Sequence, residues 1–202
     1  VMAVEMMQPG ATGPREVVLA LPPPRKGYSS LKMIYPPLSL LSIAGFLKRE
    51  QPGTRIRILD GQVMDMESMM RRILASTPDV VGLSVSLLNY MNGLELAEAA
   101  KRRGALVVFG GHYATSIPER ILNNRPFVDA VVSGDGERAF TDFVAEKPWG
   151  EIDNLVYRNR DGVVRNRRVN MELADLPLTD YTLIENVDAY VNTSLRFKKV
   201  FI

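Results

Sequence analysis

The chain contains no cysteine, which excludes disulfide bonds, thiolate nucleophiles and Cys-ligated zinc or iron–sulfur clusters from these 202 residues. It has one histidine, His112, and no further ligands are spaced to complete a metal site around it, so we assign no metal ligand. No apolar run reaches the ~18 residues that a membrane span needs. With 25 basic and 23 acidic residues, the charge indicates neither a nucleic-acid nor a membrane partner. We expect a cytoplasmic protein.

What is present is the composition of a globular chain, with 46% apolar and 24% charged residues. Residues 1–15 form a lead-in without the basic and apolar regions of a signal peptide. Short apolar runs then alternate with helical patterns. The runs cover residues 17–21, 55–59, 80–85, 105–109 and 129–132, and the helical patterns cover residues 38–50, 67–75 and 93–103 and follow each of the last two runs.

Four of these runs, all except residues 55–59, show no polar alternation, which is typical of strands buried on both faces. Only helices on both sides of a sheet cover such strands. The sequence therefore predicts an α/β fold with a doubly wound, mainly parallel, five-stranded sheet of Rossmann or flavodoxin-like type over residues 16–148.

The pattern changes after residue 148. Residues 154–164 predict a small hairpin with an Asp161-Gly162 turn, residues 173–178 a linker, and residues 197–202 a final apolar strand. Residues 149–202 thus form a separate hairpin and linker. Because a chain seldom stops on an exposed apolar strand, we expect the natural protein to continue past Ile202.

Small and flexible residues follow the predicted strands at their carboxyl ends, where open parallel sheets bind ligands. Ser84 and Ser86 offer small hydroxyls, and paired glycines let a ligand approach the backbone. Together these strand ends predict a long, flat cleft. The alternative for each single loop is that its glycine or serine ends a strand and caps a helix.

Residues 134–139 also match the G-x-G-x-x-A dinucleotide fingerprint. That fingerprint belongs to the first strand–helix turn, however, and here it follows the fifth predicted strand. The residue 20 positions after Gly134 is Asn154 rather than an acid. NAD or FAD binding therefore stays a minor alternative.

Four segments in this order resemble the cobalamin-binding domain of cobalamin-dependent radical S-adenosylmethionine enzymes. They are PPLSLLSIA (36–44), PDVVGLSVS (78–86), GGHYAT (110–115) and VSGDGE (132–137). The later segments NLVYR (154–158), DG (161–162) and DLP (175–177) also resemble that family's path toward its barrel.

The resemblance implies a Rossmann-like domain that holds cobalamin at the carboxyl edge of its sheet. The nucleotide tail would enter the cleft, and the corrin ring would lie over the loops after the first and third strands. The cofactor-binding residues implied are Tyr35, Pro37, Leu38, Ser84, Val85, Ser86, Leu87, Leu88, Asn89, Gly110, Gly111, His112, Tyr113, Thr115, Gly134, Asp135, Gly136 and Glu137.

In the family, a following barrel carries a C-x-x-x-C-x-x-C site for a four-iron cluster and S-adenosylmethionine. This chain lacks those cysteines. We therefore expect a non-catalytic module whose partner is a radical S-adenosylmethionine barrel of the same parent chain. The parent would be a methyltransferase or a related C–C bond-forming or ring-forming enzyme. The alternative from another class is a cofactor-free, flavodoxin-like signalling or interaction domain.

The D-x-H-x-x-G motif, whose histidine ligates cobalt in many other cobalamin domains, is absent: Asp60-Gly61-Gln62 does not match it. The resemblance therefore implies base-off cobalamin without a His ligand, its lower face meeting the turn at residues 87–90 or Tyr35, with Asn89 and Leu88 as candidates. The family tends to place Pro then His after the paired glycines, whereas this chain has His112 then Tyr113. His112 is therefore expected to contact the cofactor or its own backbone.

Three further groups have structural interpretations. Arg158, Arg160, Arg165, Arg167 and Arg168 form a basic cluster that we interpret as a solvated ribbon face, with phosphate or RNA contact as the alternative. Asp135 and Glu137 are explained by helix capping and ligand hydrogen bonds rather than acid–base catalysis. Four methionines are interpreted as core or as a domain contact: Met64, Met66, Met69 and Met70.

Overall fold

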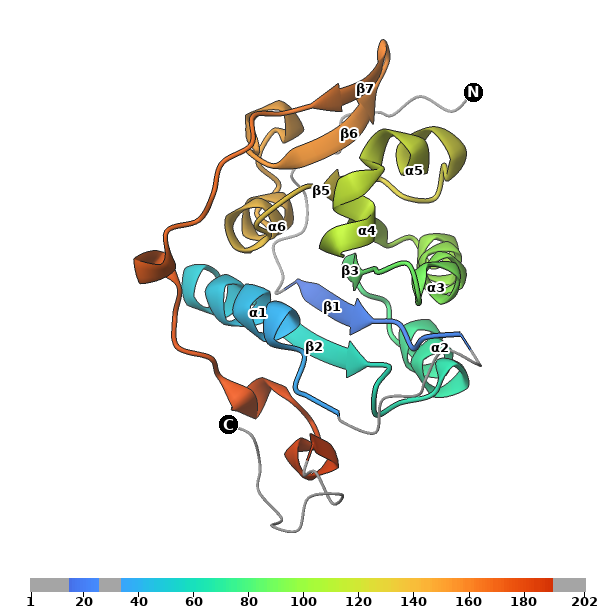
Figure 1. Ribbon diagram of the computed structural model, residues 1–202, viewed down its shortest axis with the longest axis vertical. Coiled ribbons are helices and arrows are strands. Elements are labelled where there is room, and N and C mark those ends of the chain that lie inside the picture. The colour runs from blue at the N-terminus through green and yellow to red at the C-terminus, as the bar shows by residue number, and fades with distance from the viewer. Residues whose placement is uncertain (1–14, 26–33, 191–202) are drawn as a thin grey trace.

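The computed structural model describes residues 15–25 and 34–190, so the expected lead-in and the expected strand at 197–202 lie outside the described residues, apart from Arg15. One sheet runs through the molecule in the order β2-β1-β3-β4-β5-β6-β7 (Figure 1). Its strands are β1 (Glu16–Leu21), β2 (Arg55–Asp60), β3 (Val80–Ser84), β4 (Leu106–Gly110), β5 (Ala130–Val132), β6 (Leu155–Asn159) and β7 (Gly162–Arg165). The first five are parallel, and their order is the flavodoxin-like one.

Helices cover both faces of the sheet, as predicted. Along β1, Val17 and Leu19 face one core cluster and Val18 and Ala20 face the other. The first cluster packs under α1 (Leu38–Glu50) and α6 (Glu137–Val144). The second packs under α2 (Met66–Ala75), α3 (Tyr90–Arg102), α4 (Gly111–Ser116) and α5 (Pro118–Asn124). This two-sided burial explains why β1, β3 and β4 carry no polar alternation, whereas β2 at the edge of the sheet exposes Arg55 and Arg57.

The element boundaries mostly match the sequence pattern. Helix α3 begins at Tyr90, three residues before the predicted start at Gly93. The helix predicted after β4 is divided in two, because Pro118 cannot continue α4 and instead begins α5. Met69 is fully buried, and Met64, Met66 and Met70 pack against the same core, which confirms their structural interpretation. No helix in the described part of the chain is both long and apolar enough to cross a bilayer.

The sheet has seven strands rather than the five predicted, because the hairpin β6–β7 joins it. Strand β6 pairs antiparallel with β5, with Leu155 opposite Val132. Both Leu155 and Val156 are buried, so this pairing covers an edge that a three-residue β5 would otherwise leave open. The division of the chain at residue 148 remains a prediction.

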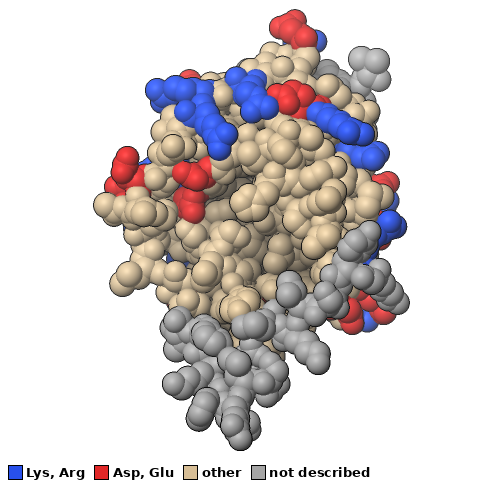
Figure 2. Space-filling model, viewed as in Figure 1, with Lys and Arg blue, Asp and Glu red and all other residues tan. Residues whose placement is uncertain are grey.

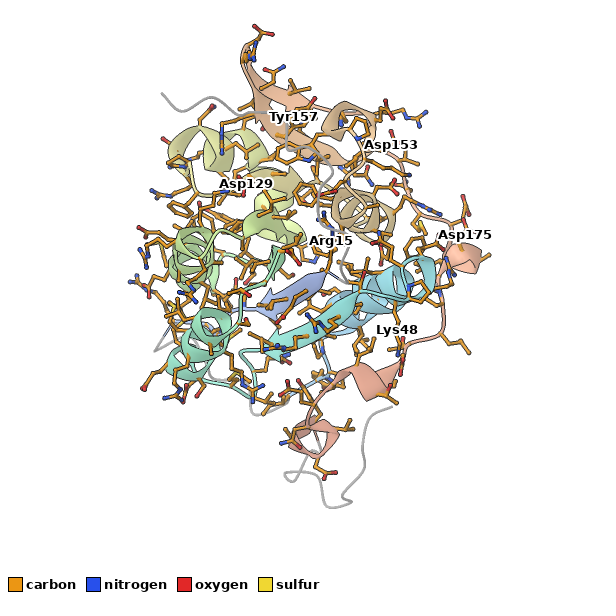
Figure 3. The ribbon with its side chains drawn as sticks, turned by 180° about the vertical axis from the view of Figure 1, so that it is seen from behind. Arg15, Lys48, Asp129, Asp153, Tyr157 and Asp175 are labelled. Carbon is orange, nitrogen blue, oxygen red and sulfur yellow. The ribbon has the colours of Figure 1, made fainter. Side chains whose placement is uncertain are left out.

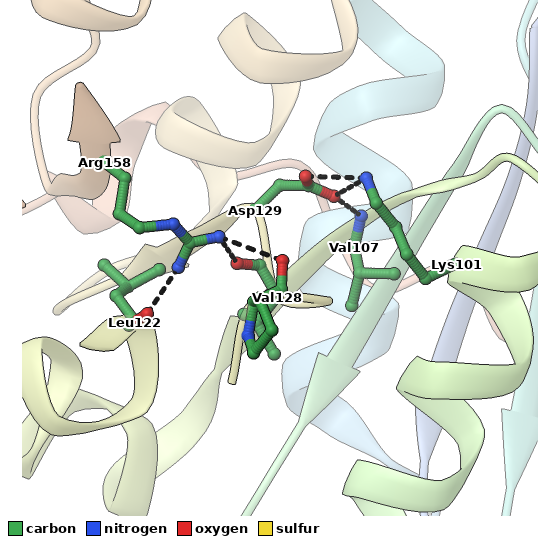
Figure 4. A network of polar contacts seen from close by, with 7 residues as sticks. Lys101, Val107, Leu122, Val128, Asp129 and Arg158 are labelled. Atoms are coloured by element: carbon green, nitrogen blue, oxygen red, sulfur yellow. Dashed lines mark hydrogen bonds and ion pairs between the residues drawn. The ribbon is translucent and has the colours of Figure 1, made fainter. Parts of the chain in front are cut away.

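Arg158 fastens the hairpin to the body of the domain (Figure 4). Its guanidinium donates to the carbonyl oxygens of Leu122 at 2.6 Å, Val128 at 2.5 Å and Pro126 at 3.2 Å. Next to it, the Asp129 carboxylate accepts from the Lys101 ammonium at 2.7 Å and from the Val107 amide at 2.8 Å. Arg158 is therefore a structural residue, and the prediction of a solvated basic face is wrong for it.

The segment after β7, residues 166–190, packs back onto the domain and is called the strap here. Arg49 of α1 donates to the Asp175 carbonyl oxygen at 2.9 Å, and Lys48 pairs with Asp180 at 3.1 Å. Figure 3 shows Lys48 and Asp175 on this same side of the molecule. Ile184 and Tyr190 of the strap are buried. The predicted linker is therefore an ordered covering of α1.

Candidate functional site

A cleft of about 490 Å³ opens at the carboxyl ends of β1, β3, β4 and β5, between the starts of α1 and α6. It spans the point between β1 and β3 where the strand order reverses, which is the usual ligand position in this topology. Figure 2 shows a hollow in this face, with acidic side chains beside it and basic side chains gathered above it. The described residues thus form a cleft where the sequence predicted one.

Most of the predicted cofactor residues meet at this cleft. It is lined by the predicted residues Ser84, Val85, Ser86, Gly110, Gly111, His112, Thr115, Gly134, Asp135, Gly136 and Glu137. They come from three different strand ends that are far apart in the sequence. The structure therefore brings together eleven of the residues that the resemblance implied.

The floor of the cleft is apolar and was not predicted from the sequence. It is made by residues from the strand centres and from α1 and α6: Leu19, Leu21, Leu40, Ile43, Gly82, Leu83, Val108, Phe109, Val132 and Phe140. The polar side chains of Ser39 and Arg168, which were not predicted either, complete the lining. One signal for it was a glycine inside a buried strand. A Cβ at Gly82 would stand 2.7 Å from the Phe140 ring and 2.9 Å from Leu19, so the missing side chain lets the floor pack closely.

Two glycines at the rim differ in the space and backbone conformation that a side chain would meet. Gly111 has a φ of +87°, and a Cβ there would meet the Val85 carbonyl oxygen at 2.7 Å. A side chain at Gly111 would therefore strain the backbone. Gly110 is extended, and a Cβ on it would meet nothing within 4 Å. The fold therefore tolerates a side chain at Gly110, but that side chain would fill part of the cleft.

The other predicted residues lie outside the cleft. Four of them are exposed side chains in the segments that follow β1 and β3: Tyr35, Leu38 at the start of α1, Leu87 and Leu88. We call these four residues the shelf. Pro37 is buried before α1, and Tyr113 lies partly buried with its ring edge-on to Tyr90 at 4.8 Å.

Asn89 is directed inward rather than toward the shelf. Its amide oxygen accepts from the Ser86 backbone amide at 2.7 Å, and its amide nitrogen donates to the Pro22 carbonyl oxygen at 3.1 Å. The side chain is buried, and these bonds hold the β1 and β3 loops together. Leu87 and Leu88 are left as the exposed members of the turn.

The two carboxylates of the rim are held by the protein. Glu137 accepts from the Ser42 hydroxyl at 2.7 Å, and Asp135 accepts from the Met171 backbone amide at 2.7 Å. Neither makes a side-chain capping bond at the start of α6, so that part of their interpretation is wrong. Glu137 still lies in the first turn, where a negative charge is favourable.

His112 lines the cleft at the start of α4. Within residues 15–25 and 34–190, no group of three or more His, Cys, Asp or Glu side chains could hold a metal ion. The glycines of the dinucleotide fingerprint, Gly134 and Gly136, follow β5, the last parallel strand, rather than the first strand–helix turn. Their position does not favour a dinucleotide.

Two methyltransferases are similar to this chain in sequence. An uncharacterised methyltransferase of Pyrococcus horikoshii is 29% identical over 84% of this chain and 39% of its own length. The cobalamin-dependent radical SAM methyltransferase TokK of Streptomyces tokunonensis is 33% identical over 35% of this chain and 11% of its own. This chain therefore spans well under half of these relatives.

Solved structures support the same fold. The cobalamin-dependent S-adenosylmethionine radical enzyme OxsB, solved with aqua-cobalamin and S-adenosylmethionine bound, matches 81% of this chain and 24% of its own, with a TM-score of 0.69 and 18% identity. The radical S-adenosylmethionine methyltransferase TsrM from Kitasatospora setae matches 76% of this chain and 30% of its own, with a TM-score of 0.58 and 21% identity. The B12 binding domain model matches residues 25–144, more than half of the sequence, and the chain therefore belongs to the B12-binding domain family.

Proposed function

We propose that this chain holds base-off cobalamin without a His ligand, as the cobalamin-binding module of a longer radical S-adenosylmethionine enzyme. The family assignment supports the cofactor, and the relatives and solved neighbours support the class of parent enzyme. One observation carries the proposal: the cleft is lined from the carboxyl ends of the parallel strands, and the exposed shelf residues belong to the segments that follow β1 and β3 at those same ends. A cytoplasmic location and the absence of a nucleic-acid partner stay predictions of the sequence.

The residues present fit the two parts of this cofactor. The apolar floor, with Leu19, Val108 and Phe140, suits the flat aromatic base of the nucleotide tail. The hydroxyls of Ser84 and Ser86 and the open backbone at Gly110 suit its ribose. The shelf supplies exposed apolar surface for the lower face of the corrin ring.

The lower axial position has no histidine in this proposal. The one histidine, His112, stands at the cleft and not on the shelf. Asn89 is committed to bonds with Ser86 and Pro22. Leu87 and Leu88, which are 72% and 47% exposed, then face the lower side of the ring.

The module's own part is binding and orientation. Cobalamin, when bound, supplies the methyl-carrying or redox chemistry, and the protein sets its position and its axial surroundings. The chain's residues would hold the tail, support the ring and exclude a nitrogen ligand. The relatives' names favour a methyltransferase as parent, with a ring-forming or C–C bond-forming enzyme as the second possibility, and the partner would be the parent's own radical S-adenosylmethionine barrel.

Electron paramagnetic resonance tests the axial assignment. The 202-residue chain is mixed with cob(II)alamin, and the cobalt hyperfine lines are recorded. We expect lines without the additional splitting that a lower axial nitrogen produces. A threefold splitting from one ¹⁴N nucleus would overturn the base-off, His-free assignment, and loss of that splitting in His112→Ala would identify the ligand.

A further inference from the structure

The arginines of the basic cluster differ in their partners. Arg158 donates to backbone carbonyls, Arg165 pairs with Glu119 at 2.6 Å, and Arg167 pairs with Asp153 at 2.8 Å. In the described part of the chain, the Arg168 side chain has no hydrogen bond or ion pair, and it lines the cleft. One guanidinium of the cluster is therefore available at the ligand site.

Its position depends on a glycine. A Cβ at Gly134 would stand 3.3 Å from Nε of Arg168 and 3.8 Å from its Nη2, so the guanidinium lies over the Gly134 backbone. Gly134 has a φ of +120°, which few other residues adopt. The loop after β5 thus leaves room for this arginine at the rim.

Asn154 fixes the backbone on both sides of Arg168. The backbone amide of Asn154 donates to the Arg167 carbonyl oxygen at 2.8 Å, and the backbone amide of Val169 donates to Oδ1 of the Asn154 side chain at 2.7 Å. Nδ2 of Asn154 also donates to the Asp135 carbonyl oxygen at 3.0 Å. Asn154 is buried and has a left-handed φ of 63°. This arrangement binds the Arg168 segment directly to the cleft rim.

Neither neighbouring acid forms an ion pair with the Arg168 guanidinium, because each carboxylate has another partner. The carboxylate of Asp135 accepts from the Met171 amide, and that of Glu137 accepts from the Ser42 hydroxyl. An arginine fork matches the oxygens of a phosphate in a bidentate way. Cobalamin carries such a group, the phosphodiester of its nucleotide tail. The inference that this phosphodiester is the ligand rests on the proposed function.

We propose that Arg168 binds the phosphodiester of the cobalamin nucleotide tail at the mouth of the cleft, and so selects complete cobalamin over corrinoids that lack the tail. Arg168 is then a specificity-determining residue. Arg168 contributes to cobalamin affinity through an electrostatic interaction at an exposed position, and this contribution weakens as salt is added.

The test compares two probes on three proteins. Absorbance titrations with hydroxocobalamin and with hydroxocobinamide, which has no nucleotide tail or phosphodiester, are run on the unsubstituted chain, Arg168→Gln and Arg160→Gln. Arg160 is the matched control, because it is exposed at the hairpin turn and does not line the cleft. Circular dichroism melts verify that all three are folded.

We expect Arg168→Gln to weaken hydroxocobalamin binding about tenfold at low salt and to leave hydroxocobinamide binding unchanged. Arg168→Lys should recover part of the loss, and Arg160→Gln should change neither probe. The salt dependence of hydroxocobalamin binding should be shallower in Arg168→Gln, which decides the matter even if hydroxocobinamide binds no protein. Equal hydroxocobalamin affinity and salt dependence in Arg168→Gln, an equal loss for both probes, or an equal loss in Arg160→Gln would overturn the inference. Failure of the unsubstituted chain to bind hydroxocobalamin would instead overturn the proposed function.

Discussion

The hydroxyl of Tyr190 donates a 2.8 Å hydrogen bond to the carboxylate of Asp60, 130 residues earlier in the chain. Asp60 ends β2 and also accepts from the Gln62 amide at 2.9 Å, and both Asp60 and Tyr190 are 3% exposed. Burial raises the pKa of the Asp60 carboxyl, and burial together with the neighbouring carboxylate raises the pKa of Tyr190. The pair closes the strap onto the edge of the sheet.

Replacing Tyr190 by Phe should destabilise the domain, because a buried carboxylate loses a donor while the ring still packs. We expect the free energy of unfolding in urea to fall by about 1–3 kcal/mol. Thr182→Ala is a suitable control, since that residue is also on the strap but its bond to Asp180 is exposed. An unfolding midpoint unchanged in Tyr190→Phe would show that the strap does not depend on this bond.

Asp60 should give folding a pH dependence of a definite sign. Its folded-state pKa lies above the ordinary value of 3.8, so the folded protein holds the proton more tightly than the unfolded chain. Its contribution to stability is therefore complete below pH 3.8 and is lost as the pH rises through the raised pKa.

Asp60→Asn carries no titrating group at this position. The difference in unfolding free energy between the unsubstituted chain and Asp60→Asn, measured from pH 3 to pH 8, should fall as the pH rises and then level off. Other titrating groups cancel in the difference. A difference that rises with pH would mean that the carboxylate, not the carboxylic acid, is the form that the fold prefers.

Arg158 should not be replaceable by Lys. Three carbonyl oxygens surround its planar guanidinium, and a lysine ammonium is a single point of charge that cannot reach all three in the same geometry. We expect Arg158→Lys to lose about 1–3 kcal/mol of stability by chemical denaturation. Arg160→Lys, on the exposed turn, should lose nothing measurable, and equal behaviour of the two variants would refute the structural role.

Gly110 and Gly111 should respond to substitution in different ways. Gly110→Leu places a side chain where the backbone accepts one, and the chain should fold normally but bind hydroxocobalamin at least about tenfold less tightly. Gly111→Ala forces a Cβ against Val85 at a φ of +87°, and it should cost about 1–3 kcal/mol of folding stability. Melting curves and titrations on both variants distinguish the two effects. Normal binding by a folded Gly110→Leu would place the ligand elsewhere.

The sequence predicted the layers of the fold but not their full extent. Continuous apolar runs such as residues 17–21 require cover on both sides, and this is a local signal. The pairing of Leu155 with Val132 joins two strands that are separated in the sequence. The sequence does not indicate whether the hairpin pairs with β5 or stays separate from the sheet. The packing of the strap was not predicted for the same reason, since Tyr190 and Asp60 are 130 residues apart and no sequence pattern connects them.

The candidate site was also predictable only in part. Strand ends such as Gly110-Gly111 are readable because topology places them at one edge. The apolar floor uses residues that also look like ordinary core, so Phe140 and Val108 carry no separate signal. The orientation of Asn89 and Arg168 depends on partners in other loops, and the sequence alone could not separate Arg168 from its paired neighbours.

The measurement that tests the central assignment most directly is an equilibrium absorbance titration of the unsubstituted 202-residue chain with hydroxocobalamin. The account predicts saturation at one cobalamin per chain, micromolar affinity, and a shift of the bound spectrum to the base-off form. A flat titration with chain that circular dichroism shows to be folded, or a bound spectrum that remains base-on, would contradict it.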